Sequence, residues 1–236
     1  MHARPLQFVL GNEQDCDYLP GRSARTAFLI SDREHAGNDY QTLIKQGFRR
    51  SGDLIYRPCC RECKACVPVR IPVERFQPSR KQQRTWKKNA DLRVDRKPPV
   101  FNPVHFDLYR RYLNARHPGG AMGESGPEEY LRFLSSAWAR TSFYEFTLDS
   151  RVVAVAVVDH LNDALSAVYT FFEPKLAKRS LGSYAILREI EEARQLGLPF
   201  LYLGYWIEAC VKMAYKTDYR PIEGQFERRW RLINDR

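Results

Sequence analysis

The chain has 236 residues and a formal net charge of +10 at pH 7, with 44% hydrophobic and 13% aromatic residues. This composition excludes a disordered chain, and the length is enough for one large domain or two small ones. The positive charge favours a polyanionic partner such as RNA or DNA, although an ordinary basic enzyme can have the same balance. The start of the chain is too polar for a signal peptide, and no apolar run is long enough to span a bilayer. We therefore expect a cytoplasmic protein that does not contact membranes.

The part of the chain before the Pro98-Pro99 pair predicts short strands and two helices. The expected elements are strands at residues 6–10 and 23–30, a helix at 39–47, a hairpin at 48–56, a strand at 67–76, a basic helix at 79–89 and a strand at 92–96. Because the two prolines punctuate the pattern, we place a domain boundary there, between residues 1–98 and 99–236.

The second part predicts longer elements. They are helices at 105–117 and 128–138, strands at 142–148, 152–161 and 164–172, a helix at 181–196, a strand at 200–203, a helix at 207–215 and a strand at 225–232. This order matches the N-acetyltransferase-like (GNAT) fold. The predicted fold class is therefore α+β, with a small cysteine-containing N-terminal domain packed on a GNAT-like C-terminal domain. In GNAT proteins the helix after the central strands presents its N-terminus to a phosphorylated group, and the corresponding turn here begins at Arg179.

Cysteines are concentrated between residues 59 and 66. Closely spaced thiolates suit zinc or an iron–sulfur cluster, and the candidate ligands are Cys60, Cys63 and Cys66 with the distant Cys16. The alternative is a set of reduced thiols that pack the N-terminal domain, because the adjacent Cys59 and Cys60 cannot easily face one tetrahedral centre. Both interpretations stay open at this point.

The basic segment that follows carries aromatic side chains among its charges. Its candidate nucleic-acid-binding residues are Arg80, Arg84, Lys88 and Asn89. Cations follow a phosphate backbone, and amides reach sugars or base edges. The alternative is a solvated helix face, which is the usual explanation of a run of charges.

Near the end of the chain, a short apolar strand leads into a segment with tyrosines and lysines. Tyr205 could orient an attacking amine or an ester carbonyl, and Lys212 and Tyr215 are the other two catalytic candidates. Lys212 and Lys216 are four residues apart, so they would share one helix face and could meet a phosphate or an acidic side chain. The alternative is a core aromatic cluster with solvated lysines.

These segments together resemble the bacterial aspartate/glutamate leucyltransferases, relatives of the eukaryotic arginyl-tRNA–protein transferases. The matching motifs are Cys16-x-Tyr18-Leu-Pro-Gly-Arg22, Tyr56-Arg-Pro-Cys-Cys-x-x-Cys-x-Ala-Cys-x-Pro68-x-Arg70, Ser79-Arg80-x-Gln82-x-Arg84, Tyr202-Leu-Gly-Tyr-Trp-Ile207, Lys212-Met-x-Tyr-Lys216 and Tyr219-x-Pro221-x-Glu223. They are spread over nearly the whole chain.

The resemblance implies transfer of leucine from leucyl-tRNA to proteins that begin with Asp or Glu, which then enter regulated proteolysis. It implies no cofactor for the transfer itself, while the eukaryotic relatives carry a cysteine-based cluster. An acidic first residue needs a cation to read it, and the candidates are Arg70 first, then Arg22 and Lys212. Three alternatives remain: arginine as the donor, an acetyl-CoA-dependent acetyltransferase, and a non-catalytic RNA-binding or redox-sensing protein.

Overall fold

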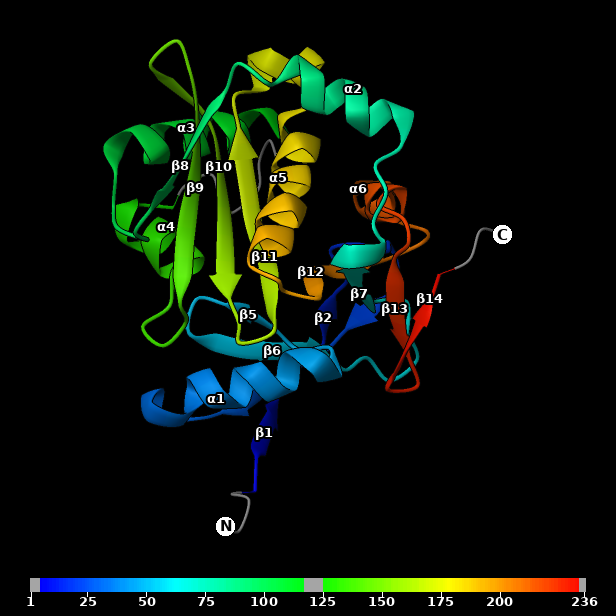
Figure 1. The fold of residues 1–236 in the computed structure, drawn as a ribbon. Helices are drawn as coiled ribbons and strands as arrows, with labels where there is room; N and C mark the ends of the chain where they lie inside the picture. Colours follow the sequence, from blue (N-terminus) through cyan, green and yellow to red (C-terminus); the bar gives the residue numbers. More distant parts are fainter. Residues whose placement is uncertain (1–4, 117–124, 234–236) are drawn as a thin grey trace.

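The fold was analysed in a computed structural model, which describes residues 5–116 and 125–233. Its largest element is a mixed sheet of eight strands in the order β14-β13-β7-β12-β11-β10-β9-β8 (Figure 1). The strands are β7 (Val67–Pro72), β8 (Arg93–Lys97), β9 (Thr141–Leu148), β10 (Arg151–His160), β11 (Ala164–Phe172), β12 (Phe200–Trp206), β13 (Glu223–Phe226) and β14 (Arg229–Leu232). Neighbouring strands are antiparallel except for β11 and β12, which are parallel.

The first part of the chain forms two smaller sheets. One has the order β1-β4-β6-β5 and the other pairs β2 with β3. Their strands are β1 (Gln7–Leu10), β2 (Gln14–Asp15), β3 (Ser23–Ala24), β4 (Thr26–Ile30), β5 (Arg49–Ser51) and β6 (Leu54–Pro58). Helix α1 packs on the four-stranded sheet through a buried cluster that includes Leu29, Tyr40 and Ile55.

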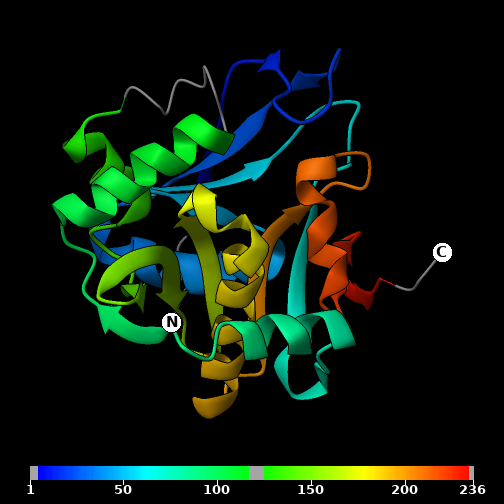
Figure 2. The same cartoon turned by 90° about the horizontal axis from the view of Figure 1, so that it is seen from above.

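Helices α3, α4 and α5 cover the two faces of the large sheet. The helices of the described residues are α1 (Arg33–Leu43), α2 (Arg80–Lys88), α3 (Pro103–Arg116), α4 (Pro127–Leu134), α5 (Leu181–Gln195) and α6 (Val211–Ala214), with 3-10 turns η1 (Ile44–Gln46), η2 (Val73–Arg75), η4 (Pro174–Arg179) and η5 (Tyr215–Asp218). Figure 2 shows α3 and α5 on opposite sides of the sheet. Each side has its own apolar cluster, one built around α5 and one around α3 and α4.

Local sequence explains the helix boundaries. The basic helix α2 begins after Ser79, which accepts a hydrogen bond from the Gln82 backbone N–H while the Gln82 side chain accepts one from the Ser79 N–H. This capping box fixes the start of the helix close to the expected residue. Helix α1 begins earlier than expected, because the Asp32 side chain caps it by accepting a hydrogen bond from the His35 N–H.

Three expectations for the end of the chain are wrong in extent. Strand β12 runs on to Trp206 because β7 pairs with it there. The helix expected at 207–215 shrinks to α6, so Lys212 is exposed on α6 while Lys216 is buried on η5, and the two lysines do not share a helix face. The last strand is a hairpin, because Glu227 and Arg228 adopt positive φ and turn the chain.

The mixed helix–strand class is confirmed, but the expected boundary after residue 98 does not divide the sheet. Strands β7 and β8 precede that boundary, and both lie in the eight-stranded sheet with strands from the second part. Within the described residues, no helix has the length and apolar content needed to cross a membrane.

Candidate functional site

The parallel strands β11 and β12 stay together for only three residue pairs, which end at Ser166 and Tyr202. Beyond these pairs β11 remains with β10, whereas β12 continues beside β7. A register irregularity in β12 follows Tyr202, and Gly204 has φ of 78°, a conformation that favours glycine. We call this separation, between residues 167–172 of β11 and 204–206 of β12, the β11–β12 fork.

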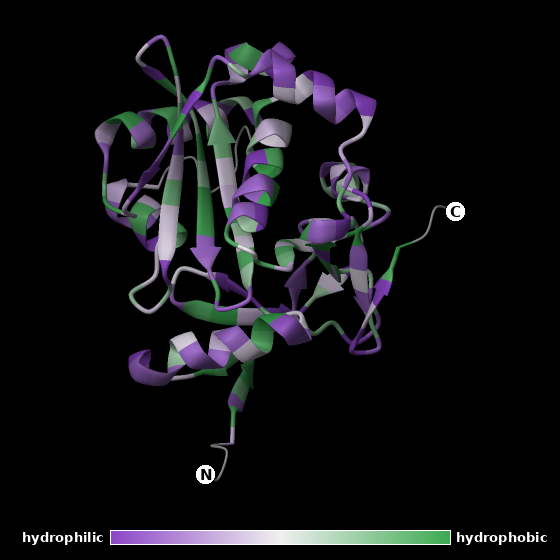
Figure 3. Cartoon of the chain, in the orientation of Figure 1, coloured by the Kyte–Doolittle hydropathy of each residue, from purple (hydrophilic) through white to green (hydrophobic). Residues whose placement is uncertain are grey.

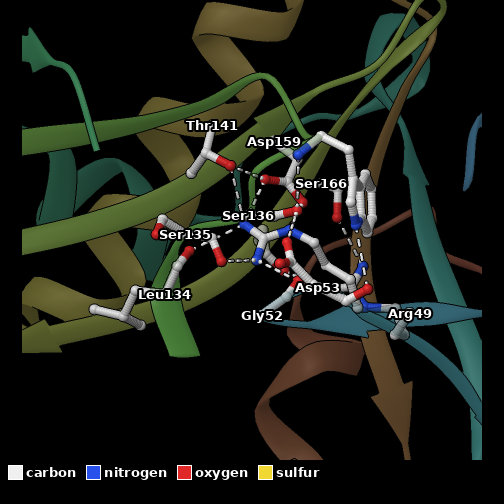
Figure 4. Close-up of polar contacts among 12 residues, drawn as sticks. Arg49, Gly52, Asp53, Leu134, Ser135, Ser136, Thr141, Asp159 and Ser166 are labelled. Atoms are coloured by element: carbon white, nitrogen blue, oxygen red, sulfur yellow. Dashed lines mark hydrogen bonds and ion pairs between the residues drawn. The ribbon is translucent and has the colours of Figure 1, made fainter. Parts of the chain in front are cut away.

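Arg49 of strand β5 lies at the start of the fork. Its guanidinium donates to Ser166 Oγ at 2.9 Å and to the carbonyl oxygen of Ala167 (Figure 4). A Cβ on Gly204 would lie 3.5 Å from Arg49 Nε, so Arg49 also lies close to β12. The side chain is buried, and no carboxylate of the described residues lies within 4.0 Å to pair with it. A buried guanidinium without a counter-ion is unusual, because desolvation disfavours the charge.

Glu189 of helix α5 is a second buried charged residue in this region. It is 2% exposed, and neither of its carboxyl oxygens has a hydrogen-bond partner. Burial raises the pKa of Glu189 to about 8, against the opposing influence of Arg49. Most Glu189 side chains are therefore protonated at neutral pH, close to the pH where the group can give or accept a proton.

Lys216 and Tyr205 lie beside the same fork, as two of the expected catalytic and substrate-binding residues. The Lys216 ammonium donates to the carbonyl oxygen of Tyr205, and the Tyr205 hydroxyl donates to the carbonyl oxygen of Gly47 at 2.7 Å. Burial, reinforced by Arg49, lowers the pKa of Lys216 to about 7. Half-exposed Tyr215, the third catalytic candidate, interacts electrostatically with Glu189. Three of the predicted residues therefore lie near one another, and Lys212 points to solvent.

Arg70, the first candidate for reading an acidic residue, already has a carboxylate partner. Its Nε lies 2.8 Å from Glu223 Oε2, and the guanidinium lies 3.6 Å from the ring centre of Phe200 and 4.4 Å from that of Trp230. This arrangement matches a structural ion pair that also stacks on aromatic rings. The other candidate, Arg22, is exposed beside the two-stranded sheet.

The candidates on α2 divide into two groups. Arg80 and Arg84 are exposed, and exposed Lys88 donates to the carbonyl oxygen of Lys178. Figure 3 shows α2 as a hydrophilic helix at the edge of the molecule. Asn89, in contrast, is fully buried and donates to the carbonyl oxygens of Thr85 and Arg179. In this geometry the Asn89 amide links α2 to η4, and the substrate-binding role expected for it stays a prediction.

The cysteines gather without forming a recognisable metal site. Cys66 interacts electrostatically with Cys16, Cys60, Cys63 and Cys210, and burial raises its pKa to about 11. In residues 5–116 and 125–233, no group of three or more His, Cys, Asp or Glu side chains is placed to hold a metal ion. This geometry does not fit a metal centre, and no reaction step is assigned to one.

Sequence analysis missed Arg49 and Glu189. Arg49 lies in a hairpin strand, and a charged residue in a short buried strand is a signal that could have identified it. Glu189 lies four residues from both Ala185 and Ala193 on the buried face of α5. A carboxylate at an apolar position of a helix is the corresponding signal.

A separate cavity of about 290 Å³ lies between α1 and the end of β10. Its lining includes His160, whose pKa is lowered to about 4, mainly by burial. A histidine that stays neutral and has no carboxylate partner is a weak candidate for acid–base catalysis. The β11–β12 fork is therefore the better candidate for an active site than this cavity.

The sequence comparisons cover both parts of the chain. A family model described as "Arginine-tRNA-protein transferase, N terminus" matches residues 14–84, and one described as "Arginine-tRNA-protein transferase, C terminus" matches residues 104–225. An aspartate/glutamate leucyltransferase of Nitrosococcus oceani is 48% identical over 231 residues, which is 98% of this chain and 97% of the relative. One of Pseudomonas fluorescens is 49% identical over 229 residues, covering 97% of each chain.

Solved structures show a more distant likeness. The structure of L-PGS from Bacillus licheniformis has a TM-score of 0.48 and 11% identity, over 72% of this chain and 50% of that one. The crystal structure of FemX has a TM-score of 0.47 and 8% identity, over 77% of this chain and 63% of that one.

Proposed function

The chain belongs to the family of the aspartate/glutamate leucyltransferases, and from this premise we propose that it moves leucine from leucyl-tRNA to the α-amino group of proteins that begin with Asp or Glu. The observation that carries the proposal is the 48% identity to such an enzyme over 98% of the chain. The chain is therefore an aminoacyltransferase. Addition of leucine would mark the acceptor for regulated proteolysis, and leucyl-tRNA makes the cytoplasm the expected compartment.

The fork has the groups that this reaction needs. The ester of leucyl-tRNA is activated, so its aminolysis is downhill and depends mostly on positioning two substrates together. A free α-amino group has a pKa of about 7.7–8.0, so part of it is neutral at cellular pH. The deprotonated form of Glu189 can accept the remaining proton at small cost in free energy, because its pKa of about 8 is close to that of the amine.

Helix α2 is the proposed surface for the tRNA. Exposed Arg80, Arg84 and Lys88 lie on one hydrophilic helix that packs beside α5 (Figure 1). Lys88 is bonded to η4, which leads directly into α5. Cations along this edge can follow a phosphate backbone toward the sheet.

The finer fold assignment is also part of the proposal. Antiparallel β9, β10 and β11, the crossover helix α5 and the parallel strand β12 have the order expected of a GNAT-like unit. The separation of β11 from β12 supports this assignment. In that arrangement the acyl group and the amine meet where the two strands diverge.

One experiment tests the function and its rivals. Purified protein is incubated with tRNA charged with leucine or arginine, or with acetyl-CoA, and with a peptide that begins with Asp, after which the peptide is weighed. We expect a mass gain of one leucine from leucyl-tRNA alone. Gain of arginine or acetyl would identify the other transferases, and no gain with RNA binding retained would identify a non-catalytic RNA-binding protein.

A further inference from the structure

A basic side chain, Arg49, and an acidic one, Glu189, are both buried near the β11–β12 fork and do not pair with each other. Arg49 influences the pKa of the Glu189 carboxyl, so the two groups are within electrostatic range. No hydrogen bond or ion pair joins them in the described residues, although Arg50, the next residue of the same strand, is paired with Asp159. A protein that buries a cation and a carboxyl without joining them leaves both to be matched by something else.

The acceptor of the proposed reaction carries the complementary pair of charges. An N-terminal Asp or Glu has an α-ammonium and a side-chain carboxylate only a few bonds apart. Resting on the proposed function, we infer that Arg49 binds the side-chain carboxylate of this first residue and that Glu189 binds its α-amino group.

Arg49 has N–H donors left over to bind the side-chain carboxylate of the acceptor. Ser166 Oγ and the Ala167 carbonyl oxygen take one hydrogen bond each from the two terminal nitrogens and hold the guanidinium plane. A guanidinium has five N–H donors, so donors remain for a carboxylate. Because its present partners are a neutral hydroxyl and a carbonyl, an arriving carboxylate displaces no existing ion pair, unlike at Arg70, where Glu223 already occupies the guanidinium.

Glu189 has the corresponding properties for the amine. Both carboxyl oxygens lack hydrogen-bond partners. The groups that interact electrostatically with Glu189 are Arg49 from β5, Tyr144 from β9, Tyr215 from η5 and Tyr219 just after η5. None of these four is a carboxylate or a lysine that would compete for the ammonium.

The transfer step then balances as follows. The step uses the fraction of the protein in which Glu189 is deprotonated. There its carboxylate takes one proton from the α-ammonium, and the neutral nitrogen attacks the leucyl ester carbonyl carbon. The C–N bond forms and the ester C–O bond to the terminal ribose breaks. The second proton passes from the nitrogen to the leaving ribose oxygen, and Glu189 later releases its proton to water.

The test measures kcat and KM for two peptides that differ only in a first residue of Asp or Asn. The wild-type protein should prefer Asp by about a hundredfold or more, since an unpaired buried cation costs several kcal/mol. Arg49→Gln should bring this ratio close to one and leave leucyl-tRNA binding intact. Glu189→Gln should lower kcat for both peptides by about a hundredfold, as for a lost general base, and keep the Asp preference. Its kcat should also lose the rise with pH that titration of the carboxyl produces.

Several outcomes would overturn the inference. They are an unchanged Asp preference in Arg49→Gln, loss of the preference in Arg70→Gln instead, or an unchanged kcat in Glu189→Gln. If circular dichroism shows that Arg49→Gln does not fold, Arg49→Lys tests the same Asp-to-Asn ratio with the positive charge kept. We expect this ratio to fall at least tenfold, because an ammonium cannot bind a carboxylate through two parallel hydrogen bonds as a guanidinium does. Failure of the wild-type protein to transfer leucine to any peptide would refute the proposed function, whereas transfer without a preference for Asp would refute the assignment of Arg49 alone.

Discussion

The ion pair of Arg50 and Asp159 should be among the strongest single contributors to keeping β5 against the large sheet. Arg50 Nε and Nη2 each lie 2.6 Å from one oxygen of Asp159, and the two side chains are 0% and 1% exposed. Thr141 Oγ1 donates to Asp159, and Arg50 also donates to the carbonyl oxygen of Leu134 (Figure 4). The pair therefore joins elements on both sides of the expected domain boundary.

Asp159→Asn leaves the guanidinium buried without its counter-ion, which costs about 3–5 kcal/mol in the free energy of unfolding. At about 2–4 °C per kcal/mol for a chain of this size, Tm should fall by roughly 6–20 °C. Calorimetry and urea unfolding measure both quantities. Replacing the pair together, Arg50→Met with Asp159→Leu, should recover most of the loss, because no charge then remains buried.

Asp163→Asn is the matched control. Asp163 Oδ2 lies 2.6 Å from Lys45 Nζ, the same separation, but these side chains are 42% and 49% exposed. Solvent screening limits such a pair to about 0–1 kcal/mol. If Asp159→Asn and Asp163→Asn lower Tm equally, burial does not set the strength of the Arg50 pair and the reasoning is refuted.

The remaining predictions concern tRNA, pH and metal. Changing Arg80, Arg84 and Lys88 together to Gln should flatten the salt dependence of tRNA binding by roughly one slope unit per lost phosphate contact, and an unchanged slope would place the tRNA elsewhere. The unfolded chain releases the Glu189 proton above pH 4.5 while the folded chain keeps it to about pH 8. Stability should therefore fall as pH rises across this window by up to about 1.4 kcal/mol per pH unit, and Glu189→Gln should remove that part of the fall. Because the described cysteine geometry does not fit a metal centre, anaerobically purified protein should be fully active without stoichiometric iron or zinc, and elemental analysis that finds either metal near one per chain would contradict this.

Local pattern was enough to predict many of the elements. Apolar runs separated by turn residues identified β9, β10 and β11, and the 3.6-residue period identified α5. The basic run at 79–89 predicted α2 closely, and the capping box seen in the structure explains where that helix begins. These features depend on neighbours in the chain, which a sequence displays directly.

The site could not be assembled in the same way. Arg49 reaches Ser166 across 117 positions of sequence, and Lys216 meets Tyr205 only because a short helix ends at Ala214. Family motifs marked Tyr205 and Lys216 without saying what they contact. Arg70 illustrates the limit, because nothing local to its motif reveals Glu223 as a partner.

The position of β12 between β7 and β11 has a consequence during synthesis. Ile71 of β7 pairs with Leu201 of β12. Because β12 comes much later in the chain, β7 emerges from the ribosome long before the strand beside it has been synthesised. At about 5–20 residues per second, the wait is on the order of ten seconds. During that time a strand whose side chains are mostly buried in the finished fold stays open to other chains. The early and late thirds of the polypeptide therefore mature together, and a nascent chain of this protein needs protection until residues 200–206 have left the exit tunnel.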